Sequence, residues 1–131
     1  MSPENVEVVR RATDAWNAGN MDALREPYDP DTTVQPVQAW PEPGPYVGRD
    51  AVIRQWEKQR EAFDANDLDV VGDYIDFGDR VAVRLVWRGV GAGPEADIEV
   101  TALVTVRNGM ILDTDFFWDH SEALKAVGLE E

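Results

Sequence analysis

Residues 80–88 read RVAVRLVWR, and the alternation in this stretch decides the fold. Successive side chains of an extended strand point to opposite faces. One face of this strand is apolar and carries Val81, Val83, Leu85 and Trp87. The other face is basic and carries Arg80, Arg84 and Arg88. Because one face is apolar and the other is charged, the stretch predicts a strand of an antiparallel sheet that is buried on one side.

The same period of two continues through the C-terminal half. Further strand-like runs cover residues 68–77, 97–107 and 110–118. Turn signals separate the runs, at Gly78-Asp79, at Asn108-Gly109 and over residues 89–94. Asn-Gly and Gly-Asp pairs are typical of tight hairpins. The pattern therefore predicts a mostly antiparallel sheet.

The alternation also assigns the two faces of this sheet. We expect the apolar face to cover helices, and in the last two runs this face consists of Ile98, Val100, Ala102, Val104, Val106, Leu112, Thr114, Phe116 and Trp118. We expect the opposite face to meet solvent or a partner subunit, with Arg84, Arg88, Glu99, Thr101, Asp113 and Asp115. Opposite charges on neighbouring strands stabilise a sheet by about 0.2–1 kcal/mol per pair.

The N-terminal half shows helical spacing instead. A first helix begins at Pro3 behind the cap Ser2, ends at Gly19, and repeats apolar residues at Val6, Val9, Ala12 and Trp16. Asn20 caps a short second helix over residues 21–26. A third helix starts at residues 48–50 and presents Val52, Trp56 and Phe63 on one face.

Shorter elements connect these parts. Residues 32–35 predict a strand, and four prolines interrupt regular hydrogen bonding between residues 36 and 47. Ser121 caps a final helix over residues 122–127, which Gly128 closes. The order of elements predicts an α+β fold in which a curved sheet wraps around the N-terminal helices.

Composition narrows the class of protein. The chain has 131 residues, 44% of them hydrophobic, and carries 26 acidic against 12 basic side chains for a net charge of −14. This size indicates one domain, residues 1–131, and the acidic balance excludes an electrostatic partnership with nucleic acid or an anionic membrane. Without Cys and with one His, we expect no metal site and no cofactor. With no leader or spanning segment recognised, we expect a soluble, cytoplasmic protein.

Aromatic residues mark a candidate cavity. A curved sheet over helices leaves a hollow where its curl is greatest, and a hollow lined by aromatic side chains is the default ligand site. We expect the wall to include Trp16, Tyr28, Trp40, Trp56, Trp87, Phe116 and Trp118, with hydroxyls from Tyr74 and Thr114 orienting a ligand. The alternative interpretation is that these aromatic side chains fill an ordinary core.

The order of elements resembles the nuclear transport factor two-like superfamily, and within it the SnoaL-like proteins. The matching segments are residues 15–24 (AWNAGNMDAL), 48–53 (GRDAVI), 79–84 (DRVAVR) and 108–111 (NGMI), followed by Asp119, Ala123-Leu124 and Gly128-Leu129. The resemblance implies a cone-shaped, cystatin-like roll that covers nearly the whole chain. It also implies a homodimer joined through the outer face of the sheet.

The catalytic residues known in two branches of the superfamily are mostly not matched by residues of the same type in this sequence. In the ketosteroid isomerase branch, the tyrosine falls on Ala12, the base near Pro36 and the second acid near Ala102. In the limonene epoxide hydrolase branch, one aspartate falls on Phe116, and the arginine and other aspartate fall near Arg80 and Ala82. Both sets are incomplete in this sequence.

One acid–base pair remains. SnoaL-type polyketide cyclases use an aspartate and a histidine, and the analogous pair here is Asp119 with His120. An imidazole exchanges protons near neutral pH, so His120 and Asp119 are the candidate catalytic residues. The alternative is that both residues lie at a strand-to-helix junction as surface or capping residues.

Two functions remain open at this point. The first is binding of a small, largely apolar molecule in the cavity, without an intact catalytic set. The second is acid–base catalysis of a cyclase, isomerase or epoxide-hydrolase type on a small hydrophobic or polyketide-like substrate.

Overall fold

The computed structural model describes residues 3–38, 40, 43–62, 67–88, 97–126 and 128. Its helices are α1 (Pro3–Ala18), α2 (Met21–Arg25), α3 (Arg49–Ala62) and α4 (His120–Ala126). Its strands are β1 (Tyr28–Gln35), β2 (Tyr46–Val47), β3 (Asp67–Asp76), β4 (Arg80–Arg88), β5 (Ile98–Arg107) and β6 (Met110–Phe117). The expected cap Ser2, Phe63, the turn at residues 89–94 and Val127 lie outside the described residues.

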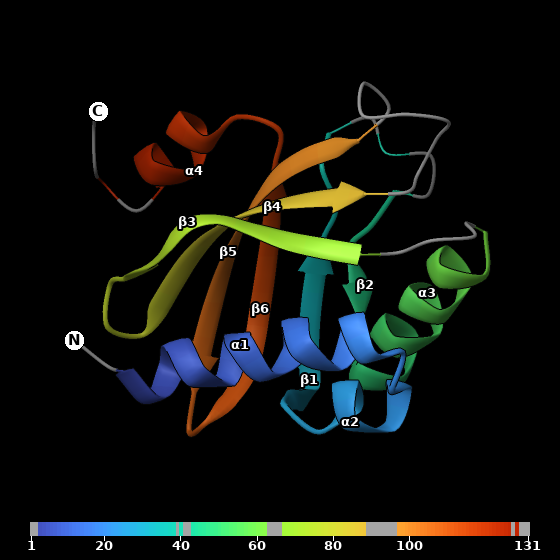
Figure 1. Ribbon diagram of the computed structural model, residues 1–131. Helices are drawn as coiled ribbons and strands as arrows, with labels where there is room; N and C mark the ends of the chain where they lie inside the picture. Colours follow the sequence, from blue (N-terminus) through green and yellow to red (C-terminus); the bar gives the residue numbers. More distant parts are fainter. Residues whose placement is uncertain are drawn as a thin grey trace.

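The strands form one curved, open sheet in the order β2-β1-β6-β5-β4-β3. Neighbours are antiparallel except β1 and β6, which run parallel (Figure 1). The α+β class and the mostly antiparallel sheet expected from the alternation are therefore confirmed. The hairpin between β5 and β6 turns at Asn108 and Gly109, with φ angles of 55° and 77°. Such left-handed values are those that an Asn-Gly turn supplies at least cost.

The C-terminus of α1 is tied to the start of β3. Gly19 closes the helix with φ at +70°, as a left-handed cap requires. The Asn17 side chain then pairs with the backbone of Leu68, donating to its carbonyl at 2.9 Å and accepting from its amide at 2.7 Å. Arg60 of α3 donates to the Trp16 carbonyl at 2.7 Å. These bonds hold three elements together at one end of the sheet.

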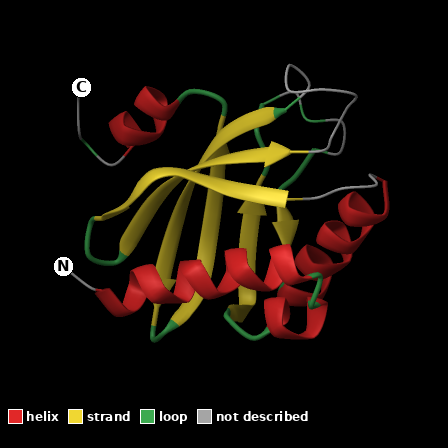
Figure 2. Cartoon of the chain, in the orientation of Figure 1, coloured by secondary structure: helices red, strands yellow, loops and turns green. Residues whose placement is uncertain are grey.

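Helices α1, α2 and α3 contribute to the main core on one face of the sheet, the inner face (Figure 2). The core combines Val9 and Trp16 of α1 with Val83 of β4 and Val104 of β5, each at most 6% exposed. The apolar alternation of β4 and β5 therefore faces the helices, as expected.

Helix α4 covers part of the opposite face, the outer face. Ala82 and Leu103 pair across β4 and β5 on this face and are 0% and 4% exposed. They do not belong to the main core cluster, whereas α4 contacts β4, β5 and β6 and buries its own Ala123 and Leu124. The C-terminal helix α4 therefore packs on the outer face through a second, smaller apolar contact.

Several boundaries differ from the expectation. Regular hydrogen bonding resumes at β2, which pairs with β1, before residue 47. Strand β1 begins at Tyr28 rather than at residue 32, and its pairing with β6 shifts register between Tyr28 and Thr33 around Pro30. A proline has no amide to donate, so an irregular register accommodates it. Helix α4 begins at His120, because the N-cap is Asp119 and not Ser121. The Asp119 carboxylate accepts a hydrogen bond from the backbone amide of Ser121.

Candidate ligand-binding cavity

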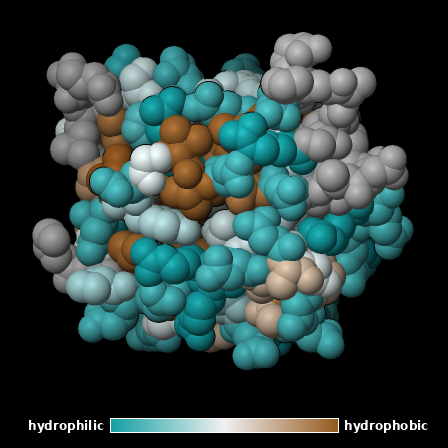
Figure 3. All heavy atoms as spheres, in the orientation of Figure 1, coloured by the Kyte–Doolittle hydropathy of each residue, from teal (hydrophilic) through white to brown (hydrophobic). Residues whose placement is uncertain are grey.

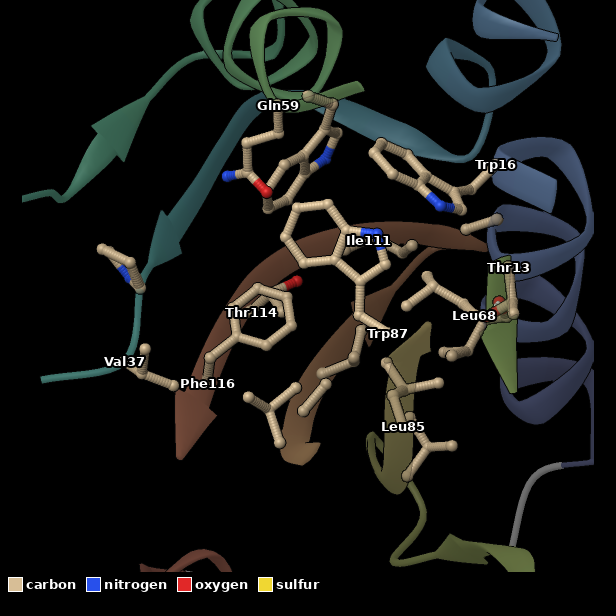
Figure 4. A pocket seen from close by; sticks show the side chains of 18 of the residues that line it. Thr13, Trp16, Val37, Gln59, Leu68, Leu85, Trp87, Ile111, Thr114 and Phe116 are labelled. Carbon is tan, nitrogen blue, oxygen red and sulfur yellow. Dashed lines mark hydrogen bonds between the residues drawn. The ribbon is translucent and has the colours of Figure 1, made fainter. Parts of the chain in front are cut away.

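A cavity of about 150 Å³ lies between the inner face of the sheet and the helices. Its aliphatic wall comes from four strands and consists of Leu68, Val83, Leu85, Ile98, Val100, Ala102, Val104 and Ile111. Its remaining wall includes Trp16 of α1 and Gln59 of α3 (Figure 4). Trp56 of α3 and Trp40 also line it. The local sequence explains this shape, because period-two strands and period-3.6 helices each present one apolar side.

Most of the aromatic side chains expected in the wall are there. The lining includes Trp16, Tyr28, Trp40, Trp56, Trp87, Phe116 and Thr114. Edge-to-face contacts hold the rings in place, at centroid distances of 6.2 Å for Trp16 with Trp87 and 6.0 Å for Trp56 with Phe116. Such pairs contribute about 0.5–1.5 kcal/mol beyond their buried area. The rings therefore form a packed frame around open space, and their role in binding a ligand stays a prediction.

Two predicted lining residues lie elsewhere. Trp118 is 50% exposed, and its indole Nε1 donates to the Gln38 carbonyl at 2.9 Å. Strand β6 ends at Phe117, so the alternation that placed Trp118 inward no longer applies there. Tyr74 packs against the main core beside α1, and the guanidinium of Arg10 lies 5.1 Å from its ring centre. The expected positions of Trp118 and Tyr74 in the wall were wrong.

A bulge changes the inner face of β6. Thr105 pairs with Asp113 and Val106 pairs with Ile111, so Leu112 is the extra residue of the strand. Ile111, Thr114 and Phe116 consequently line the cavity, and Leu112 does not. The strict alternation that placed Leu112 on the inner face was wrong at this residue, because nothing in its local sequence indicates the bulge.

The candidate acid–base pair lies away from the cavity. Asp119 accepts from the Ser121 amide at 3.0 Å and from the Ser121 hydroxyl at 2.9 Å, and these bonds lower the pKa of its carboxyl. His120 places Nδ1 3.1 Å from the hydroxyl of Thr101, whose strand neighbours Val100 and Ala102 line the cavity. Thr101 therefore lies on the outer face, and the pair does not reach the cavity from the position it occupies.

The positions of the incomplete catalytic sets divide between the two faces. Ala12, Pro36, Ala102 and Phe116 all line the cavity. Ala82 pairs with Leu103 on the outer face, and Arg80 shares that face. The positions matched to the isomerase branch, Ala12, Pro36 and Ala102, therefore line the cavity but hold side chains without a proton to exchange.

The polar atoms at the cavity are few and uncharged. Among the described residues that line it, none is an acid, a base or a histidine. The indole Nε1 of Trp56 donates to the Tyr28 hydroxyl at 3.3 Å. Burial is the main cause that raises the pKa of Tyr28 to about 12, so its phenol is neutral over the physiological range. The lining therefore suits an uncharged guest.

Sequence reasoning missed Gln59. It lines the cavity from α3, one helical turn after Trp56. A spacing of three residues places two side chains on neighbouring parts of one helix surface. That spacing was the available signal.

The outer face carries the expected ion pairs. Arg84 of β4 contacts Glu99 of β5 at 2.6 Å, and Arg88 contacts Asp97 at 2.9 Å and Asp69 of β3. Thr33 donates to Asp113 at 2.6 Å. The prediction that charges of both signs pair across strands on this face is confirmed.

Among the described helices, none has the length and apolar character to cross a membrane.

Solved structures share this fold. A proposed polyketide cyclase from Sinorhizobium meliloti is 24% identical, with 84% of this chain and 93% of that chain covered at a TM-score of 0.71. A protein of unknown function from Burkholderia pseudomallei, described as NTF2-like, is 18% identical, with 98% and 100% covered at a TM-score of 0.74. TerC, crystallised with polyporic acid, is 15% identical, with 96% and 99% covered at a TM-score of 0.73. At these identities the likeness shows the fold.

Comparison with protein families identifies the family to which the chain belongs. No curated protein matches the chain. The model of the SnoaL-like domain matches residues 9–114, a span that runs from the middle of α1 into β6 and includes every lining residue of the cavity except Phe116. The chain therefore belongs to the SnoaL-like domain family, and its fold is that of solved NTF2-like proteins.

Proposed function

We propose that this protein binds a small, largely apolar molecule in the cavity between the sheet and α1–α3. The supporting observation is the cavity itself, about 150 Å³ in volume and framed by indole and aliphatic side chains. Apolar cavities of this size accept a small aromatic guest instead of water, because water finds too few polar partners there. The guest gains about 25 cal/mol for each Å² of apolar surface that it buries.

The character of the lining favours binding over acid–base catalysis. Proton transfer needs a group that titrates near the working pH within reach of the substrate. Tyr28 is the one titratable side chain among the described lining residues, and its pKa of about 12 is far from neutral. Catalysis by His120 would require the pair at the start of α4 to reach across the sheet.

Two structural relatives support a guest that contains rings. A likeness to TerC, whose crystals hold polyporic acid, and to a proposed polyketide cyclase agrees with a ring-containing guest. The cavity here is small, so we expect molecules of one or two rings.

Fluorescence of the cavity tryptophans tests the proposal. A neutral two-ring ketone such as 1-tetralone should quench their emission with saturation. The experiment is best done in a Trp118→Phe background, because Trp118 is half exposed outside the cavity and would report non-specific contact. Saturable quenching with a rise in melting temperature would support binding. Quenching that is linear in probe, with no thermal shift, would show that the aromatic side chains belong to a closed core.

We also propose that two copies pair through the outer face. Val71 and Val86 lie on this face beside Arg84 and Asp69, by their register with β4 and β3. Figure 3 shows hydrophobic residues gathered on the surface over β3 and β4. Light scattering should give the mass of two chains, and Val86→Asp should reduce it to one. A single-chain mass at high protein concentration would contradict this pairing.

A further inference from the structure

The otherwise apolar cavity contains a few polar side chains, and some of them have donors or acceptors without a hydrogen-bond partner among the described residues. Thr13 is occupied, because its hydroxyl donates to the Val9 carbonyl at 3.2 Å and also bonds Tyr74. Gln59 and Thr114 line the cavity, and neither side chain makes a hydrogen bond with the described residues. Figure 4 shows the two side chains approaching the cavity from different walls, Gln59 from α3 and Thr114 from β6.

Tyr28 extends this polar set. Its oxygen accepts from Trp56 at 3.3 Å, which leaves the phenol hydrogen to donate, and no described residue accepts it. Trp56 and Gln59 are neighbours on α3, so the phenol and the carboxamide belong to the same side of the cavity. A buried phenol hydrogen without an acceptor destabilises the empty cavity, so a guest that accepts this hydrogen bond recovers part of that free energy.

Charge excludes two kinds of guest. No described lining residue is cationic, so a carboxylate or phosphate entering the cavity would lose its hydration without an opposite charge. No described lining residue is anionic, so the same holds for an amine in its protonated form. A pure hydrocarbon would fill the cavity but make no hydrogen bond with Gln59 or with the Tyr28 phenol.

We propose that the cavity selects a neutral molecule of one or two rings that carries a carbonyl or hydroxyl oxygen, and that Gln59 binds this oxygen. The carboxamide suits both groups, because its NH₂ donates to a carbonyl and its oxygen accepts from a hydroxyl. Tyr28 and Thr114 are the second partners for the same oxygen or for another at the far end. This inference rests on the proposed function, since it assigns the chemical class of the same ligand.

A matched set of probes tests the assignment. Indane and 1-indanone have nearly the same shape and differ by one carbonyl, and indane-1-carboxylate adds an anion. Calorimetry measures the dissociation constant of each probe for the full chain. The informative quantity is the ratio of the affinity for 1-indanone to the affinity for indane. A change in cavity shape affects both probes about equally, so the ratio reports the contribution of the carbonyl.

Gln59→Leu should lower that ratio about tenfold, the equivalent of one hydrogen bond of about 1.4 kcal/mol. Gln35→Leu is the matched control, since Gln35 is exposed on β1 and should leave the ratio unchanged. Thr114→Val, which keeps the side-chain shape, should lower the ratio by a smaller factor if Thr114 is a second partner. Indane-1-carboxylate should bind the unmodified protein at least tenfold more weakly than 1-indanone.

The outcomes separate the two proposals. If neither indane nor 1-indanone binds the unmodified protein, the proposed function fails and this inference fails with it. If both bind and Gln59→Leu leaves their ratio unchanged, the proposed function stands and the assignment of Gln59 is overturned. Equal affinity for the carboxylate and the ketone would overturn the requirement for a neutral guest.

Discussion

Filling the cavity should make the empty protein more stable and less able to bind. Val100 lies on β5 with a half-buried side chain that lines the cavity. Val100→Phe adds roughly 50 Å³ of side chain, and at ~24 cal/mol for each Å³ of cavity removed this stabilises the fold by about 1 kcal/mol. For a chain of this length that corresponds to a rise in melting temperature of about 3–5 °C.

The same substitution removes about a third of the space available to a guest, since the cavity holds about 150 Å³. We expect the affinity for 1-tetralone to fall at least tenfold, or about 1.4 kcal/mol. Calorimetric melting without ligand and a fluorescence titration measure the two effects. Val47→Phe is the control, because Val47 is 64% exposed on β2, does not line the cavity and should change neither quantity in this direction. A Val100→Phe variant that is less stable than the parent and binds equally well would show that no open space lies beside Val100.

Three further predictions follow from contacts outside the cavity. Asn17→Ala should destabilise the protein by about 1–2 kcal/mol in urea unfolding, because both hydrogen bonds to the Leu68 backbone are lost; an unchanged midpoint would refute this. Burial, with repulsion from Asp113, raises the pKa of Asp115, so the ionised carboxyl destabilises the folded state above that pKa. Asp115→Asn should therefore raise the free energy of unfolding at neutral pH, and the gain should shrink as the pH falls and the carboxyl becomes protonated. A gain that does not depend on pH would contradict this. His120→Ala should leave the affinity for 1-tetralone unchanged, because His120 bonds Thr101 on the outer face, and a large loss would place it in the site after all.

The alternation of residues predicted the sheet and its faces because it depends on local geometry. An extended backbone turns each side chain to the face opposite its neighbour, whatever the rest of the chain does. The inner positions of Val83, Leu85 and Trp87 followed from this rule. The Asn108-Gly109 turn was equally predictable, since few residue pairs adopt its φ angles at low cost.

The rule fails where a strand ends or bulges. Trp118 follows the end of β6, and its indole turned outward to bond the Gln38 carbonyl. Leu112 is the extra residue of a bulge, so Ile111 took the inner position. Both outcomes depend on partners distant in sequence, which a single run of residues does not reveal.

By itself, the sequence determined an α+β chain, acidic and rich in aromatic residues, with a sheet that is apolar on one face. The tertiary structure alone decided which polar groups meet the cavity. It placed His120 against Thr101 on the outer face, and it brought the hydroxyl of Tyr28 to the indole of Trp56. The physical reason is that secondary structure follows from the geometry of neighbouring residues, whereas a binding site is a meeting of distant residues that the curvature of the sheet and the packing of the helices bring about.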